Sequence, residues 1–203
     1  MARAIAQALG CRHVDTGAMY RAVAWRAVDQ GVNLDDEGAV ATVARVAALD
    51  AEQGRVVIDG HDVTRAIRTS EMDTAAARVA RLPRVRDVLV ARQRAYASAG
   101  DLVMEGRDIG TVVLPQADVK VYLDASAEER ARRRAGDAAH TANGGDVSTI
   151  ATALTERDHS DRSRTVSPLT QATDATYIDT TGVPIDDVVA RVLALVDAAR
   201  RRG

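Results

Sequence analysis

The sequence has 203 residues, of which 46% are hydrophobic and 28% charged, a balance typical of a folded globular chain and not of a disordered one. Its formal net charge of −2 excludes a strong overall attraction to nucleic acid or anionic membranes. No apolar run approaches the roughly 20 residues that a membrane-spanning helix needs. The single cysteine, Cys11, excludes an internal disulfide and is typical of the reducing cytoplasm.

The first half of the chain carries both helix and strand signals. Apolar residues recur at helical spacing, and glycines at positions 10 and 31 end the first two helical patterns. In chain order, the predicted elements are a helix over 2–9, a strand over 11–15, helices over 18–30 and 36–50, strands over 55–58 and 61–64, and helices over 70–80 and 83–97. Asp59-Gly60 separates the strands 55–58 and 61–64, which predicts a hairpin.

The second half alternates more regularly. In chain order, the predicted elements are strands over 101–104 and 119–123, a helix over 126–135, a polar Gly-rich segment over 136–146, a helix over 147–158, a strand over 176–179 and a helix over 184–200. Ser126, with Glu129 three residues later, forms a capping box at a helix start. Strands that alternate with helices predict an α/β fold, with a parallel sheet covered by helices on both faces.

The same pattern predicts one domain over 1–203 with an insertion. Residues 1–34 and 101–203 form the core, and about 35–100 form a helix-plus-hairpin insertion between two strands of the sheet. The Gly-rich segment over about 136–147 is polar enough to be a mobile lid.

Polar residues gather where predicted strands end, which is where ligands bind in open parallel sheets. The polar ends are Asp15-Thr16-Gly17 with Tyr20-Arg21, Gly106-Arg107-Asp108, and Asp124. Each end alone has a structural interpretation, because Asp, Thr and Gly are common in helix caps and turns. Two such ends, each with an arginine within a few residues, favour a shared anion site. Thr16 would contribute its hydroxyl, and the following helix its first amides.

Arginines are concentrated in two later segments. The charged positions of interest there are Arg130, Arg133, Arg134, Arg157, Asp161 and Arg164. The last three are spaced i, i+4 and i+7, so they share one helical face. Arginines beside a lid fit phosphoryl transfer, in which positioning and charge neutralisation do most of the catalysis. A solvated charged helix end is the structural alternative. The run 130–134 is a poor nucleic-acid site, because it is short, flanked by acidic residues and without aromatic residues.

Other chemistries find no support in the sequence. The four histidines, His13, His61, His140 and His159, have no metal-ligand spacing with one another or with Cys11. No Gly-x-Ser-x-Gly elbow is present. We therefore predict neither a resident metal site of the chain's own nor a serine hydrolase.

Six segments, taken in order, resemble bacterial cytidylate kinase, the (d)CMP kinase of the nucleoside-monophosphate kinase group. They are DTGAMYR, IRTSEMD, LPRVRDVLVARQR, EGRDIGTVVLPQADVKVYLDAS, EERARRR and ERDHSDRSR. The resemblance extends from about Leu9 to the last predicted helix, and EGRDIGTVV followed by the strand ending in LDAS is fairly specific. It implies a P-loop-kinase-like parallel sheet flanked by helices, with 35–100 as the monophosphate-binding insertion.

The resemblance implies an acceptor pocket. Thr16 matches the family's hydroxyl that holds the CMP phosphate, and Tyr20 and Arg21 match its neighbours in that pocket. Arg86, in PRVR, and Asp108, in GRD, match the pair that recognises cytosine.

The resemblance also implies residues around the reacting phosphates. Arg107 matches an arginine on the acceptor phosphate, and Asp161 matches the carboxylate on the ribose. Arg157 and Arg164 match lid-side arginines that reach the transferring phosphates. The basic edge of the lid is matched by Arg130, Arg133 and Arg134.

Two departures from the family pattern stand out. Ala77 occupies a position where relatives commonly have a hydroxyl near the base. Relatives also open with a strand and then G-x-x-x-x-G-K-[ST], whose amides and lysine hold the ATP phosphates and whose hydroxyl holds Mg²⁺. These 203 residues contain no such motif, and their only lysine, Lys120, lies in the predicted strand 119–123. ATP and Mg²⁺ are expected for the full-length enzyme. We expect this sequence to be N-terminally truncated, to lack the first, central strand, and to be marginally stable and inactive alone.

Three interpretations follow. The first is a cytoplasmic, monomeric kinase of pyrimidine metabolism that phosphorylates CMP or dCMP to CDP or dCDP with ATP. Its partners are these small molecules, and neither nucleic acid nor a membrane. The second is a non-catalytic remnant that binds CMP weakly or not at all. The third is a nucleoside-monophosphate kinase with another acceptor such as AMP or shikimate, which the long insertion and the PRVR and GRD segments disfavour.

Overall fold

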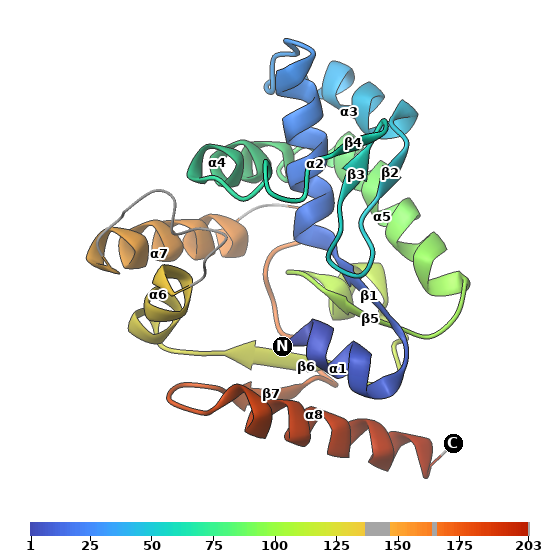
Figure 1. Ribbon diagram of the computed structural model, residues 1–203, viewed down its shortest axis with the longest axis vertical. Coiled ribbons are helices and arrows are strands. Elements are labelled where there is room, and N and C mark those ends of the chain that lie inside the picture. The colour runs from blue at the N-terminus through green and yellow to red at the C-terminus, as the bar shows by residue number, and fades with distance from the viewer. Residues whose placement is uncertain (137–146, 164–165, 203) are drawn as a thin grey trace. The chain divides into compact units, whose positions relative to one another are not determined.

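The computed structural model describes residues 1–136, 147–163 and 166–202 (Figure 1). The chain divides into two compact units. Residues 12–106 form one of them, which we call the β1–β5 unit after its parallel strands. Residues 1–11 and the described residues from 107 onward belong to the other, which we call the β6–β7 unit.

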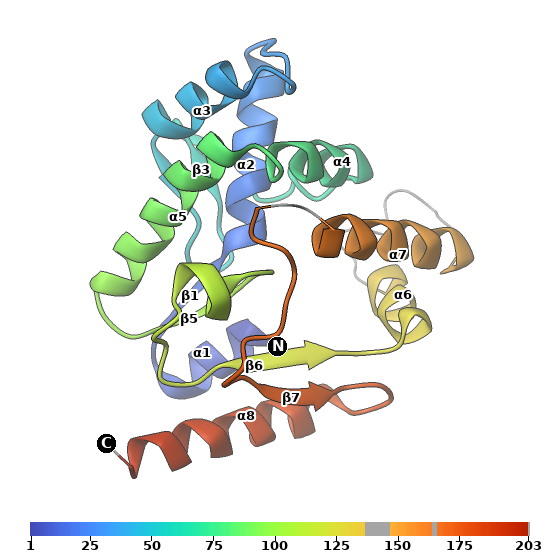
Figure 2. The ribbon, with the colours of Figure 1, turned by 180° about the vertical axis from the view of Figure 1, so that it is seen from behind.

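The β1–β5 unit combines a parallel strand pair, a small antiparallel sheet and helices (Figures 1 and 2). Its elements are β1 (Arg12–Asp15), α2 (Thr16–Asp29), α3 (Glu37–Val46), β2 (Leu49–Asp50), β3 (Val57–Ile58), β4 (His61–Asp62), α4 (Ser70–Val79), α5 (Pro83–Ser98) and β5 (Leu102–Glu105). β1 and β5 run parallel, and their register sets Asp15 opposite Glu105. The carboxyl ends of both strands therefore lie at one edge, beside the start of α2.

Local sequence fixes both ends of α2. The Asp15 side chain accepts a hydrogen bond from the backbone N–H of Ala18, at 3.0 Å, and so caps the helix start. The helix ends before Gly31, whose φ of 68° lies in the left-handed region that glycine adopts readily. Both signals are short-range, which explains why the predicted helix over 18–30 nearly matches the observed one.

The predicted hairpin is confirmed, and a third strand joins it. Asp59 and Gly60 have φ values of 48° and 79°, the two positive values that a type I′ turn requires. The backbone N–H of Ala48 donates to the Asp59 carboxylate at 2.8 Å, as does Arg26 Nε on α2 at 2.8 Å. Both hydrogen bonds lower the pKa of the Asp59 carboxyl, and the bond from Ala48 has the larger effect. The turn is thereby tied both to the segment before β2 and to α2.

The predicted helix over 36–50 is wrong at its end. The helix stops at Val46, because Ala47 takes an extended conformation with ψ of 135°. Arg92 on α5 donates Nη2 to the carbonyls of Arg45 and Ala47, at 2.9 and 2.7 Å, and so satisfies acceptors that the helix end leaves open. The residues that follow pair with β3 as strand β2.

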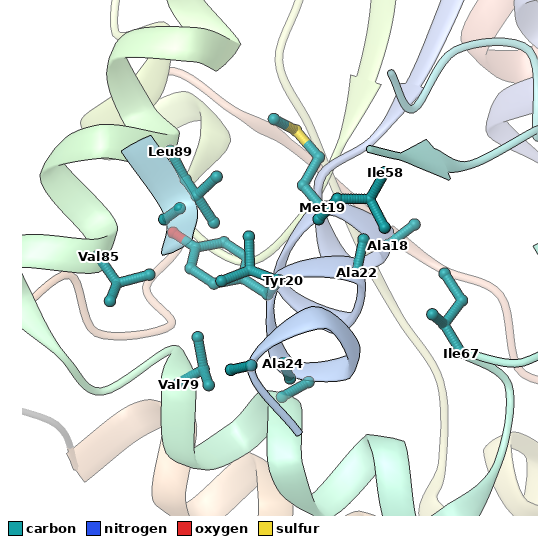
Figure 3. Close-up of a cluster of buried hydrophobic side chains, with 14 of the residues drawn as sticks. Ala18, Met19, Tyr20, Ala22, Ala24, Ile58, Ile67, Val79, Val85 and Leu89 are labelled. Atoms are coloured by element: carbon teal, nitrogen blue, oxygen red, sulfur yellow. The ribbon is translucent and has the colours of Figure 1, made fainter. Parts of the chain in front are cut away.

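The core of the β1–β5 unit surrounds α2 (Figure 3). Helices α3, α4 and α5 and strand β3 all contact α2. Alanines on α2 leave room for close approach, and larger side chains from the neighbouring elements fill the space against them. The fully buried large residues of this core include Met19, Ile58, Ile67, Val79, Val85 and Leu89.

The β6–β7 unit holds a second parallel strand pair. Its elements are α1 (Ala2–Leu9), the π-helix η1 (Ile109–Val113), β6 (Val121–Asp124), α6 (Ala127–Ala135), α7 (Val147–Ser163), β7 (Thr176–Asp179) and α8 (Ile185–Arg200). β6 and β7 pair in parallel with Asp124 opposite Asp179. α1 packs on α8, and α6 packs on α7 (Figure 2). α7 extends five residues beyond the predicted helix end at residue 158.

The π-helix η1 was not predicted. The carbonyl of Asp108 accepts hydrogen bonds from the N–H groups of Val112 and Val113, at 2.9 and 3.2 Å. The second is the i to i+5 bond that widens the turn. Gly110 lies inside it, where a Cβ atom would be 3.1 Å from Lys120 Cδ. Glycine thus allows the lysine stem to lie close against the segment that follows Arg107 and Asp108.

The prediction of an α/β fold with parallel strands flanked by helices is confirmed, and the parallel strands occur as two pairs, one in each unit. The expected insertion over 35–100 lies wholly within the β1–β5 unit. The predicted lid lies almost entirely outside the described residues, and the expectation of a missing central strand stays a prediction. Within the described chain, no helix is long and apolar enough to cross a bilayer.

We expect Val85→Ala to lower the free energy of unfolding by about 2 kcal/mol, because the Val85 side chain is fully buried and its loss leaves a cavity. Val46→Ala is the matched control: this valine also lies on a helix but is 73% exposed, so the change should stay within about 0.5 kcal/mol. Urea denaturation measures both. Equal losses would contradict the described packing of α5.

Candidate active site

Thr16 lies where the strand ends of the β1–β5 unit meet the start of α2. It is the first residue of the helix and is 4% exposed. Its hydroxyl donates to the carbonyl of Glu105, at the end of β5, at 2.7 Å. The first turn of α2 also presents backbone N–H groups and the positive end of the helix dipole. The prediction of an anion site at this helix start thus has a suitable local structure.

Arg21 is a buried cation that reaches back toward the same helix start. Its Nε and Nη2 atoms lie 2.9 and 2.8 Å from Asp73 Oδ1, on α4. A Cβ atom at Gly17 would be 3.3 Å from Arg21 Nη1, so the guanidinium lies close along the first turn of α2. Nη1 makes no hydrogen bond to any residue that the structure describes. The Nη1 donors are therefore not engaged by the ion pair, in which Asp73 balances the charge.

A second guanidinium approaches the same turn from outside α2. Arg68 Nη2 donates to Asp15 Oδ2 at 3.0 Å, while Asp15 Oδ1 accepts from the backbone of Ala18. Arg68 and Asp73 were not among the predicted site residues. Both lie in the segment IRTSEMD, but only their pairing with residues more than 50 positions away reveals them.

Tyr20 and Arg86 face each other across α2 and α5. The guanidinium carbon of Arg86 lies 5.6 Å from the centroid of the Tyr20 ring, a cation–π distance. Arg86 is 3% exposed, and its Nη1 atom is 3.4 Å from the carbonyl of Ala80. The structure therefore places Thr16, Tyr20 and Arg21 on α2 and brings Arg86, from α5, against Tyr20. Asp108 is 7% exposed and belongs to the other unit, so its predicted pairing with Arg86 stays a prediction.

The β6–β7 unit brings Arg107, Arg130 and Asp161 together around Asp158. Arg107 Nε forms an ion pair with Asp161 Oδ2 at 3.1 Å, and its Nη1 donates to Asp158 Oδ1 at 3.2 Å. Arg130 Nη1 pairs with the other oxygen of Asp158. Both aspartates lie on α7 and are less than a tenth exposed. Asp158 was not predicted, although it lies within the ERDHSDRSR segment.

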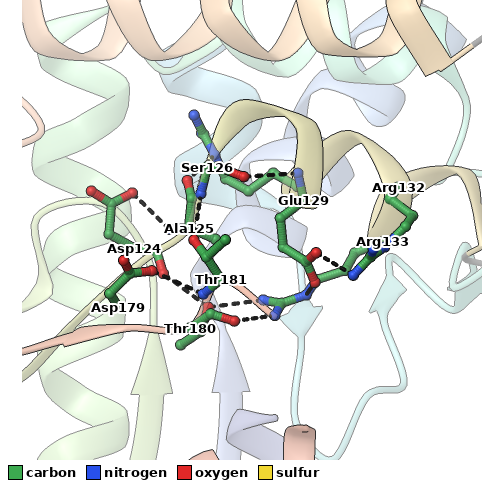
Figure 4. Close-up of polar contacts among 10 residues, drawn as sticks. Asp124, Ala125, Ser126, Glu129, Arg132, Arg133, Asp179, Thr180 and Thr181 are labelled. Atoms are coloured by element: carbon green, nitrogen blue, oxygen red, sulfur yellow. Dashed lines mark hydrogen bonds and ion pairs between the residues drawn. The ribbon is translucent and has the colours of Figure 1, made fainter. Parts of the chain in front are cut away.

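Arg133 makes structural contacts at the end of the β6–β7 pair (Figure 4). Its Nη1 and Nη2 donate to Thr180 Oγ1 and the Thr180 carbonyl, at 2.9 and 2.6 Å, and its Nε donates to Glu129 at 2.8 Å. These bonds fix α6 to the residue after β7. The predicted lid role of Arg133 stays a prediction that competes with these contacts. Arg134 lies in the last turn of α6.

The polar end of β6 is likewise explained by local hydrogen bonds. Asp124 Oδ1 accepts from the backbone of Ala125 at 2.8 Å, and its carbonyl accepts from Thr180. Ser126 caps α6 as predicted, by accepting from the Glu129 N–H at 3.2 Å. The other half of the capping box is wrong, because the Glu129 carboxylate turns to Arg133 and the Ser126 N–H donates to a threonine (Figure 4).

The remaining predictions concern residues at the end of α7 and metal ligands. Arg164 and the side chain of Arg157 lie outside the described residues. Among those that are described, no group of three or more His, Cys, Asp or Glu side chains is placed to hold a metal ion.

Comparison with known proteins matches this arrangement to one family. The model of the cytidylate kinase family matches residues 1–198. The chain belongs to the cytidylate kinase family. The cytidylate kinase of Pelotomaculum thermopropionicum is 47% identical over 206 residues, which cover 99% of this chain and 91% of that relative. Those of Geobacillus sp. and Aeromonas hydrophila are each 44% identical, covering 97% and 95% of this chain and 90% and 86% of the relatives.

Membership of the cytidylate kinase family confirms the resemblance seen in the six sequence segments. This family member is an enzyme, a phosphotransferase. Use of ATP and Mg²⁺ is general in the family. The roles of individual residues, and the expected absence of the first strand and the phosphate loop, stay predictions.

We expect Asp73→Asn to lower the free energy of unfolding by about 3 kcal/mol, because it leaves the Arg21 charge buried without its counter-ion. Asp35→Asn is the matched control. Asp35 pairs with Arg78 at 2.7 Å, but these side chains are 73% and 46% exposed, so the loss should be below about 1 kcal/mol. Urea denaturation of both variants tests this. A loss at Asp73 no larger than at Asp35 would show that Arg21 is not held by this pair.

Proposed function

We propose that this chain belongs to an ATP-dependent kinase that converts CMP or dCMP to CDP or dCDP. The observation that carries the proposal is the buried Arg21 guanidinium beside the first turn of α2, next to Thr16. A half-formed anion site of this kind suits the phosphate of a nucleoside monophosphate. An oxygen of that phosphate takes the γ-phosphoryl group of ATP, whose bond to the β-phosphate breaks, so that ADP leaves.

The acceptor side of the reaction is the better supported side. Thr16 and Arg21 bind the CMP phosphate, and Tyr20 lines the same pocket. Arg86 donates to the ring acceptors of cytosine, while Asp108 accepts from its exocyclic amino group, the pairing expected of a carboxylate. Uracil carries an oxygen in place of that amino group, so Asp108 favours cytosine over uracil.

The phosphate side uses arginines. Arg107 binds the acceptor phosphate, Arg157 and Arg164 reach the transferring phosphoryl group, and Asp161 binds the ribose. Guanidinium groups suit this task, because they donate in a planar fork that matches phosphate oxygens. Charge neutralisation and positioning supply most of the rate enhancement in phosphoryl transfer. Mg²⁺ bound with ATP adds to that neutralisation.

The described residues do not fit the donor phosphates in the way a phosphate loop does. The sequence holds no G-x-x-x-x-G-K-[ST]. Its one lysine, Lys120, is engaged: Nζ donates to the carbonyl of Pro115 at 2.5 Å and to Asp174 at 2.7 Å. We therefore assign no residue to the ATP phosphates in these 203 residues. We also propose that the enzyme works in the cytoplasm as a monomer, as a single cysteine and a low net charge favour.

We expect CMP to bind this chain more tightly than UMP or AMP in isothermal titration calorimetry. Arg86→Gln and Arg21→Gln should each weaken CMP binding by about tenfold or more, because a charged hydrogen bond contributes roughly 1.5–3 kcal/mol. Arg84→Gln is the matched control, on the same helix as Arg86 but with a side chain that is 71% exposed, and it should leave CMP binding unchanged. Absence of CMP binding would favour a non-catalytic remnant, and tighter binding of AMP another acceptor.

We expect these 203 residues alone to show essentially no turnover with ATP, Mg²⁺ and CMP in a coupled assay for ADP. The cytidylate kinase of Pelotomaculum thermopropionicum, assayed under the same conditions, is the positive control. CMP binding without turnover would agree with both halves of the proposal. Turnover at a rate comparable to the control would contradict the view that a phosphate loop is indispensable.

A further inference from the structure

Asp158 is a buried carboxylate to which the proposed function gives no role. It lies on α7, and its side chain is only 6% exposed. A carboxylate in such a position is costly unless cations compensate it. Arg107 and Arg130 do so, one from the segment after β5 and the other from α6.

The two guanidinium groups bind different oxygens of the same carboxylate. Arg107 Nη1 donates to Oδ1, and Arg130 Nη1 pairs with Oδ2. Two like charges so close together would otherwise repel each other. Further contacts fix each plane: Arg107 Nε faces Asp161 at 3.1 Å, and Arg130 Nε donates to the carbonyl of Ala125 at 3.1 Å. Asp158 therefore lies between the two groups and contacts both.

Each guanidinium keeps unused donors on its outer side. The Nη2 atoms of Arg107 and Arg130 make no hydrogen bond to any described residue, and the two side chains are 36% and 31% exposed. Because an arginine presents five N–H donors in one rigid plane, fixing its inner edge also fixes where the outer donors lie. Each side chain thus keeps an Nη2 group near the shared carboxylate while remaining partly open to solvent.

We propose that Asp158 is a positioning residue that holds Arg107 and Arg130 as a two-arginine clamp for phosphate oxygens. The inference rests on the proposed phosphoryl-transfer function, which places Arg107 at a phosphate. The clamp binds a phosphoryl group through the outer donors, while the carboxylate stays bound between the guanidinium groups. Asp158 touches no substrate.

A competing interpretation predicts the opposite effect of Asp158→Asn on anion binding. If Asp158 merely occupies the place of a phosphate, its replacement by asparagine removes a competitor and strengthens anion binding. If Asp158 positions the arginines, asparagine can accept from one guanidinium but turns its amide donors toward the other. The clamp is then lost although the local positive charge rises.

Titration with inorganic pyrophosphate at low salt distinguishes the two. We expect Asp158→Asn to weaken pyrophosphate binding by about tenfold, as for the loss of one charge-assisted hydrogen bond. The control is Glu156→Gln, the same change in charge at an exposed position of the same helix, and it should bind as the wild type does. Equal or tighter binding by Asp158→Asn, or no binding by the wild type, would overturn the clamp.

A second set of variants decides the matter if Asp158→Asn does not fold. Arg107→Lys and Arg130→Lys keep both charges beside Asp158 but lose the planar fork. Each should weaken pyrophosphate binding by about tenfold, and the double variant should lose little more than either single one, because the forks act as a unit. Wild-type binding by the lysine variants, or fully multiplicative losses, would overturn the clamp. CMP binding, measured separately, tests the proposed function, so either idea can fail alone.

Discussion

The pairing of buried or partly buried guanidinium groups with carboxylates from neighbouring helices is the constraint on which both units depend. A site for phosphate must hold positive charge before the ligand arrives, and such charge is costly where water is partly excluded. In the β1–β5 unit, Asp73 on α4 balances Arg21 on α2. In the β6–β7 unit, Asp158 balances two arginines from separate segments. The helices of each unit are thus connected by the same arginines for which we propose a role in phosphate binding.

This pairing changes what an anion gains on binding. The cluster of Arg107, Arg130, Asp158 and Asp161 carries two positive and two negative formal charges, so net attraction is small. What remains for a ligand is a set of oriented N–H donors, whose direction is fixed by the carboxylates behind them. In the clamp that we propose, phosphate oxygens are recognised through the fixed geometry of these donors, which a lysine does not reproduce.

The parts of the fold that could be predicted from sequence are those decided by short-range chemistry. Asp59-Gly60 predicted the hairpin, because a two-residue type I′ turn needs positive φ at both positions and Asp-Gly is a favoured pair there. The two-residue strand β2 could not be found in this way, because it is defined by its pairing with β3. The helix end just before it is bound by Arg92, 45 positions along the chain from Ala47. The π-helix η1 was missed as well, because neither its i to i+5 hydrogen bond nor the close approach of the Lys120 stem to Gly110 leaves a signal in the sequence.

The residues of the candidate site also differ in whether short-range sequence patterns could identify them. Arg21, Arg107 and Asp161 could be singled out because their spacing and motifs are visible in one dimension. Asp158 lies three residues before Asp161 and could not be separated from a solvated helix end, because its importance lies in which arginines reach it. Arg133 is the converse case: its place in a basic run suggested a lid, but its donors are engaged by Thr180 and Glu129. Sequence patterns thus identify which charges are available, and only the packing of elements that are distant in the chain decides which partners those charges meet.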